Sequence, residues 1–186
     1  MKNIFIITLF VFTSTISLSQ NKIGVFAGIN GSTISDGIMK STGMHSNSFS
    51  FHIGGLYEIE LSEKISFRPK IIVSQQGDRE DFDDNMKYEF TYLNLPLNFK
   101  FFKKTYILAG PQFGILLNTK KNEFDYGDID SLDYGVNLGI GRNINDFFIE
   151  FNMYQGIKTL IEVTTIDRTN LSATNTIIQL SLGFNF

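Results

Sequence analysis

Histidine and serine are the residue types from which nucleophilic catalysis could be built in this chain, because a serine needs a neighbouring base to become a nucleophile. The chain contains two histidines, His45 and His52, with Ser48 and Ser50 between them. Neither the nucleophile-elbow pattern GxSxG nor the zinc-protease pattern HExxH occurs. The residue types therefore indicate no catalytic site, and we interpret His52 as a polar structural residue.

Two acidic runs could attract cations, one between residues 78 and 84 and one between residues 123 and 133. An EF-hand places its oxygen ligands at fixed positions of a loop of about 12 residues, and neither run follows that spacing. Glycine-rich phosphate loops are absent as well. We predict solvated loops with no metal and no cofactor, and weak divalent-cation binding or lipopolysaccharide-bridging contacts are the alternative. The acidic residues are Asp78, Glu80, Asp81, Asp83, Asp84, Glu123, Asp125, Asp128, Asp130 and Asp133.

The elements that must position these residues are strands. Large apolar residues alternate with small or polar residues in eight stretches, and no window shows convincing helical spacing. The connections after the second, fourth and sixth stretches have about three or four residues. The polar loops after the first, third, fifth and seventh stretches, read as residues 32–47, 77–87, 118–131 and 158–173, have roughly ten to sixteen. The stretches cover residues 23–30, 48–61, 65–76, 89–101, 105–117, 133–142, 147–154 and 177–186.

This alternation of short and long connections predicts an eight-stranded antiparallel up-and-down transmembrane β-barrel with short periplasmic turns and long extracellular loops. Closure of the barrel would satisfy every backbone donor and acceptor within lipid. A soluble exported barrel or sandwich is the alternative. Pro69, Pro96 and Pro111 fall inside the predicted strands, where proline cannot donate to a ladder, so we expect bulges or ends of pairing there.

Six charged residues share the polar face of these strands, which a barrel turns toward its lumen. An eight-stranded barrel is just wide enough for side chains to fill, and charges buried there must pair. We therefore predict a mixed-charge network that plugs the lumen, with a small channel or an ion relay as alternatives. The residues of this predicted network are Glu58, Glu60, Arg68, Lys70, Lys100 and Glu150.

The first residues, MKNIFIITLFVFTSTISLSQ, have the basic start, short apolar run and small residues of an export signal. We predict a signal peptide at residues 1–19 and a single barrel domain at residues 20–186. The chain has no cysteine, which excludes a lipid anchor and disulfides, and its formal charge of −3 argues against nucleic-acid binding.

Several blocks of the chain resemble the small outer-membrane β-barrel proteins of Bacteroidota, the group that includes PorT. The resemblance covers residues 20–186 and is made of patterning and glycines rather than a catalytic signature. Lys70 departs from it, since an acidic residue is expected after Pro69. The blocks are GVFAGINGS, FHIGGLYEIELSEKISFRPKIIVSQQG, YLNLPLNFKFF and AGPQFGILL.

The resemblance implies a non-enzymatic structural or binding component of the outer membrane of a Gram-negative bacterium. A PorT-like accessory role in type IX secretion is an alternative, and a lipid-modifying enzyme at the barrel rim using His45 or His52 is another. It further implies that Leu182, Phe184 and Phe186 form a C-terminal insertion signal. The expected partners are outer-membrane lipids, the barrel assembly machinery, and envelope or secretion-system proteins.

Overall fold

A computed structural model describes residues 21–35, 48–79, 87–121, 130–159, 161–164 and 170–186 of the chain. Within these ranges every regular element is a strand, and no helix is long and apolar enough to cross a membrane. The strands are β1 (Lys22–Ser35), β2 (Ser48–Glu60), β3 (Ile65–Arg79), β4 (Lys87–Phe101), β5 (Thr105–Lys121), β6 (Leu132–Ile144), β7 (Phe147–Gly156), β8 (Ile161–Thr164) and β9 (Asn170–Asn185).

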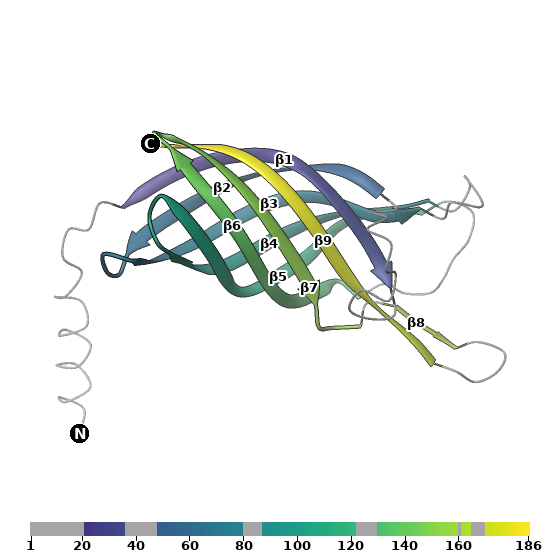
Figure 1. The fold of residues 1–186 in the computed structure, drawn as a ribbon. Coiled ribbons are helices and arrows are strands. Elements are labelled where there is room, and N and C mark those ends of the chain that lie inside the picture. The colour runs from purple at the N-terminus through teal and green to yellow at the C-terminus, as the bar shows by residue number, and fades with distance from the viewer. Residues whose placement is uncertain (1–20, 36–47, 80–86, 122–129, 160, 165–169) are drawn as a thin grey trace, which may run out of the picture.

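Eight of these strands close into an antiparallel barrel. Each of the strands from β1 to β6 pairs with the next in the chain, β7 pairs with β9, and β9 returns to pair with β1 (Figure 1). The closing ladder runs from Gly24 opposite Asn185 to Ser35 opposite Thr174. The predicted fold class, an eight-stranded antiparallel up-and-down β-barrel, is therefore confirmed.

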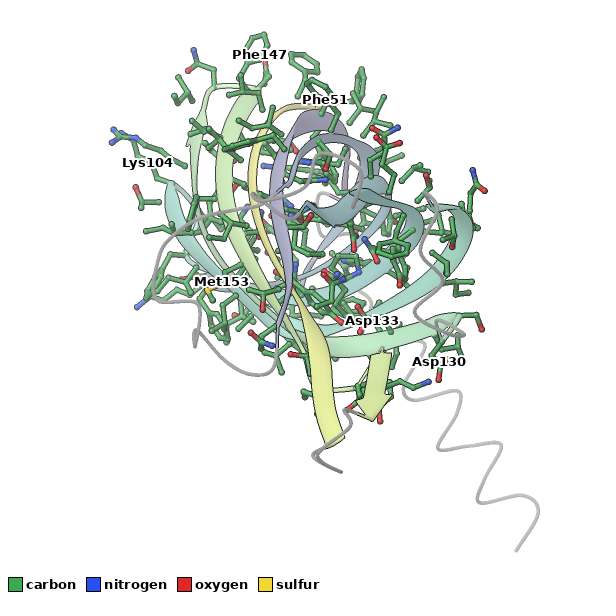
Figure 2. All side chains as sticks on the ribbon, turned by 90° about the vertical axis from the view of Figure 1, so that its right-hand side faces the viewer. Phe51, Lys104, Asp130, Asp133, Phe147 and Met153 are labelled. Carbon is green, nitrogen blue, oxygen red and sulfur yellow. The ribbon has the colours of Figure 1, made fainter. Side chains whose placement is uncertain are left out.

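The outer face of the barrel is apolar and the inner face is polar. Side chains such as Phe51 and Leu182 are 70% and 66% exposed, and Phe51 and Phe147 project from the outside of the barrel (Figure 2). Their neighbours of opposite parity point inward, as β7 shows by alternating exposed and buried residues from Phe147 to Asn152. This inverted pattern is expected of a barrel whose outside contacts lipid.

The short connections lie at one end of the barrel. Leu61–Lys64, Phe102–Lys104 and Asn145–Asp146 join consecutive strands there, and the last residue, Phe186, lies at the same end. In barrels of this class the short turns are periplasmic. We call this the turn end and the opposite one the loop end.

Several strands are longer at the loop end than the sequence predicts. Residues 158–173 were expected to form a polar loop, but they include β8 and the first part of β9, which pair with each other from Ile161 opposite Ala173 to Thr164 opposite Asn170. The expectation of a plain loop was wrong because hydrophobic alternation marks only lipid-facing segments, while hairpin pairing continues beyond them through backbone hydrogen bonds.

The prolines interrupt the ladders without shifting their register. Beside each of them two successive residue pairs are skipped, and pairing resumes in the same register. The expected interruptions of pairing are therefore found at the prolines. The expected bulges are not found there, because the register shift between β4 and β5 lies at Thr91 and Tyr92. The skipped residues are Tyr57, Glu58, Arg68 and Pro69; Lys70, Ile71, Leu95 and Pro96; and Leu97, Asn98, Gly110 and Pro111.

Gly28 of β1 allows a buried side chain to lie against the barrel wall. A Cβ atom at this position would be 2.0 Å from the carbonyl oxygen of Leu180 and 2.7 Å from Cε1 of His52. One of these contacts is backbone, so the clash could not be relieved by a side-chain rotation. A glycine is therefore required where β1 passes between β9 and His52.

We predict that Gly28→Ala lowers the free energy of unfolding by about 1–3 kcal/mol, the usual cost of overpacking. Urea unfolding of the refolded protein in detergent, followed by circular dichroism, would measure it. Gly55→Ala is the matched control, because the nearest atom to its added Cβ is 3.8 Å away. Equal stability of the two variants would contradict the proposed packing role of Gly28.

Candidate functional site

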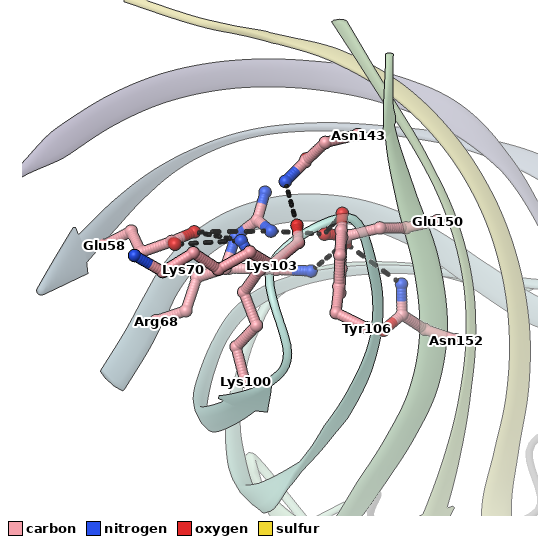
Figure 3. A network of polar contacts seen from close by, with 9 residues as sticks. All are labelled: Glu58, Arg68, Lys70, Lys100, Lys103, Tyr106, Asn143, Glu150 and Asn152. Carbon is pink, nitrogen blue, oxygen red and sulfur yellow. Dashed lines mark hydrogen bonds and ion pairs between the residues drawn. The ribbon is translucent and has the colours of Figure 1, made fainter. Parts of the chain in front are cut away.

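Five charged residues from β2, β3, β4 and β7 meet inside the barrel near the turn end (Figure 3). Nζ of Lys100 donates to both carboxylate oxygens of Glu58, at 2.8 and 2.9 Å. Nη1 of Arg68 lies 3.1 Å from Oε1 of Glu150 and 3.6 Å from Oε2 of Glu58, and Nζ of Lys70 donates to Oε2 of Glu150. We call Glu58, Arg68, Lys70, Lys100 and Glu150 the charge network.

Glu60, the sixth charged residue that the sequence groups with these, lies apart from them. It is half-buried and forms an ion pair with the exposed Lys103, at 3.0 Å between Oε1 and Nζ. Only Ile59 separates it from Glu58, so it points to the same side of β2 but sits nearer the end of the strand. At that position it reaches the rim of the turn end instead of the buried network.

Burial makes pairing within the charge network obligatory. Arg68 and Glu150 are both 0% exposed, and the other three members are almost as deeply buried. Removing such ions from water costs several kcal/mol each, and close opposite charges with hydrogen bonds are needed to offset it. The two carboxylates lie among three cations, which satisfies this requirement for the carboxylates.

Aromatic rings form a second set of partners for the cations. The guanidinium of Arg68 lies 4.6 Å from the ring centre of Phe148, and Nζ of Lys100 lies 4.5 Å from that of Tyr106, within the range of cation–π attraction. The hydroxyl of Tyr106 also donates to Oε1 of Glu150 at 2.8 Å. Sequence reasoning missed Tyr106 and Phe148 as members of this site. Their parity relative to Gln112 and Glu150 places them on the inner face and could have identified them.

Glycines on neighbouring strands give these rings their space. In register, Gly183 of β9 stands between Phe148 of β7 and Phe26 of β1, and Gly54 of β2 stands beyond Phe26. A Cβ at Gly183 would be 2.1 Å from Cζ of Phe148, and one at Gly54 would be 2.7 Å from Cζ of Phe26. Each ring thus covers a neighbouring glycine, and together they close the lumen beside the charge network.

A polar layer follows toward the middle of the barrel and contains His52. Its Nδ1 lies 2.6 Å from Oδ1 of Asn30 and its Nε2 lies 2.8 Å from Oγ of Ser181. Because Nδ2 of Asn30 donates to Ser74 and to the carbonyl of Gln75, its Oδ1 acts as acceptor. The proton of neutral His52 therefore sits on Nδ1, and Nε2 accepts from Ser181.

Ser181, His52 and Asn30 are thus linked by hydrogen bonds through the imidazole. Serine, histidine and a third polar group are linked in the same way in a catalytic triad. Catalysis would require space for a substrate carbonyl beside Ser181. Instead Ser181, His52 and Asn30 are all buried, and β1 approaches the imidazole closely at Gly28. The arrangement fits a structural hydrogen-bond network on the inner wall, away from the rim. His45 lies outside the described residues.

At the loop end the described residues include three of the predicted acidic residues. Asp133 is buried and accepts from Nδ2 of Asn175 at 3.1 Å. Asp130 forms a hydrogen-bonded ion pair with Lys158. The hydrogen bond from Lys158 holds the pKa of the Asp130 carboxyl below its usual value. Asp78 lies in β3 opposite Tyr88. The other acidic residues lie outside the described ranges, within which no group of His, Asp and Glu has the arrangement of a metal site.

The last residues of the chain lie on the outer face at the turn end. Leu182 and Phe186 are strongly exposed. The ring of Phe184 packs edge-to-face against Phe147 and Phe186, with ring centres 5.0 and 5.2 Å apart. The backbone nitrogen of Phe186 donates to the carbonyl of Ile23 at 2.8 Å, so the terminal residue takes part in barrel closure.

We predict that Glu150→Gln destabilises the protein by about 3–5 kcal/mol, because it leaves Arg68 and Lys70 buried without their shared carboxylate. Equilibrium urea unfolding in detergent would measure the loss. Glu60→Gln is the control, since its partner Lys103 is exposed and such pairs contribute about 0–1 kcal/mol. Similar effects of the two substitutions would show that burial does not govern the energetics of these charges.

A family model described as outer membrane protein beta-barrel domain matches residues 18–162. No curated protein matches the chain. The solved structures similar to it include Ail, the attachment invasion locus protein of Yersinia pestis, with 14% identity, a TM-score of 0.48 and coverage of 89% of this chain and 99% of that chain.

Two further structures show the same level of similarity. OprG from Pseudomonas aeruginosa has 8% identity and a TM-score of 0.49, and covers 92% of this chain and 98% of its own. Neisserial surface protein A has 9% identity and a TM-score of 0.48, with 90% and 98% covered. Because the family model spans most of the chain and the fold is a closed barrel with an apolar outer face, the protein belongs to the outer membrane protein beta-barrel domain family.

Proposed function

We propose that this protein is a non-enzymatic, non-conducting barrel that serves as a structural or binding component of the cell envelope. The observation that carries the proposal is the filled lumen at the turn end. There the charge network and the rings of Phe26, Tyr106 and Phe148 occupy the interior. Since an eight-stranded barrel has room for little more than its own side chains, such a filling blocks passage.

The position of His52 supports a non-enzymatic role. A lipid-modifying enzyme works on a substrate at the rim or on the outer face, where the bilayer is accessible. His52 and Ser181 are both buried on the inner wall. The outer face consists instead of exposed apolar residues, and we propose that its partners are outer-membrane lipids.

A PorT-like accessory role in type IX secretion, in a member of the Bacteroidota, is the second candidate. It is supported by the resemblance of blocks such as GVFAGINGS and AGPQFGILL, which lie in β1 and β5. In this role the barrel would hold envelope or secretion-system proteins at one of its ends. Normal export of type IX cargo in a strain lacking the protein would exclude it.

We also propose that residues 1–19 are removed on export and that Leu182, Phe184 and Phe186 are read by the barrel assembly machinery. Residues 1–20 lie outside the described part of the chain. The exposed aromatic end of β9 supports the second half of this proposal, because Phe186 is 74% exposed and accessible to a partner.

The blocked lumen predicts that the refolded protein gives no stable conductance steps in planar-bilayer recordings. A variant with Glu58→Ala and Arg68→Ala removes one carboxylate and one cation, so it preserves the net charge while opening space. We expect measurable conductance from this variant once its folding is verified by heat-modifiable electrophoretic mobility. Stable ion conductance by the wild-type protein would refute the non-conducting assignment.

Deletion of Phe186 is expected to lower the yield of protein in the outer-membrane fraction severalfold, because the terminal aromatic is lost to the assembly machinery. Quantitative mass spectrometry of fractionated envelopes would measure this yield and would also identify the first mature residue, expected to be Gln20. Phe186→Tyr keeps an aromatic ring and should retain the wild-type yield. An unchanged yield after the deletion would argue against the insertion signal.

A further inference from the structure

The charge network carries an uneven charge. It contains three cations, Arg68, Lys70 and Lys100, and two carboxylates, Glu58 and Glu150, which gives a formal charge of +1. The nearest charges on neighbouring positions do not correct this. Lys22 of β1 stands opposite Glu58 in register and is a further cation, and Glu60 is neutralised by Lys103.

The carboxylate oxygens of the network already have several donors. Both oxygens of Glu58 accept from Lys100. Oε1 of Glu150 accepts from Tyr106 and lies beside Arg68, while Oε2 accepts from Lys70 and, at 3.5 Å, from Nδ2 of Asn152. These two carboxylates therefore accept from four side chains, Lys70, Lys100, Tyr106 and Asn152, and little acceptor capacity remains for more.

Arg68 has donors left over. Its Nε, Nη1 and Nη2 atoms are buried, and none of them donates a hydrogen bond to a described residue, although Nη1 lies within ion-pair distance of both carboxylates. The side chain is 0% exposed and is enclosed by the rings of Phe148 and Tyr106. A guanidinium has five N–H donors and cannot lose its charge in a protein, so burial with unused donors is costly.

We propose that the charge network binds one small inorganic anion, singly charged and of the size of chloride, beside the guanidinium of Arg68. Such an anion would neutralise the excess charge and accept from the unused N–H groups. A protein carboxylate could neutralise the excess positive charge only if the network contained a third acidic residue, and it contains two. The tight enclosure by aromatic rings favours a monatomic anion over a polyatomic one such as phosphate.

A saturable anion effect on stability is the test. Wild-type protein refolded in detergent is unfolded with urea in sodium chloride, sodium bromide or sodium gluconate of equal ionic strength. A bound anion lowers the unfolding equilibrium constant by the factor 1 + [anion]/Kd, about tenfold when its concentration is about nine times Kd. We expect this saturable effect with chloride and bromide and not with gluconate, which is too large for the site.

Two matched variants locate the effect. Lys70→Met removes one cation and makes the network neutral, so the dependence on chloride should disappear. Lys103→Met removes an exposed cation that pairs with Glu60, and it should keep the dependence. Equal stability of the wild-type protein in chloride and gluconate would overturn the proposal and would indicate instead that one lysine of the network is neutral. Loss of the effect in Lys103→Met would also overturn it, by assigning the anion to the surface.

A direct observation covers the case in which Lys70→Met does not refold. Crystals of the wild-type protein grown in sodium bromide would be measured at the bromine absorption edge. Anomalous difference density within hydrogen-bonding distance of Arg68 would support the site. Its absence there, in crystals that order bromide elsewhere, would reject it.

Discussion

The constraint on which this molecule depends is that no backbone donor or acceptor of a strand can be left unpaired in lipid. The ladder between β1 and β9 meets this constraint by joining the first and last strands, so the sheet has no open edge within the barrel. Closure then decides the direction of every side chain. Residues of one parity face lipid, and those of the other parity share a narrow interior where they must fit and pair.

The interior is organised in layers because of that narrowness. Charges with aromatic rings fill the turn end, a hydrogen-bond network around His52 and Asn30 follows, and Asp133 with Asn175 lies at the loop end. Glycines are part of the same packing, since Gly183 and Gly28 leave room for Phe148 and His52. The side chains that stabilise the barrel are thus the same ones that fill its interior.

The ladder interruptions at the prolines lie beside this filled region. Glu58, Arg68 and Lys70 are among the residues skipped next to Pro69 and Pro96. The network therefore sits where backbone pairing is weakest across β2, β3 and β4. Side-chain pairing across the lumen connects these strands to β7 through Glu150, so it adds cross-links where the wall itself has fewer hydrogen bonds.

The sequence by itself determined the number of barrel strands, their antiparallel order and the face of each residue, because period-two alternation and connection length are local properties. It also placed Glu58, Arg68 and Glu150 on the inner face. Only the tertiary structure decided which of these charges meet, since contacts across the lumen depend on register and strand tilt. That is why Glu60 fell outside the network, why Tyr106 and Phe148 entered it, and why β8 was found only once backbone pairing was known.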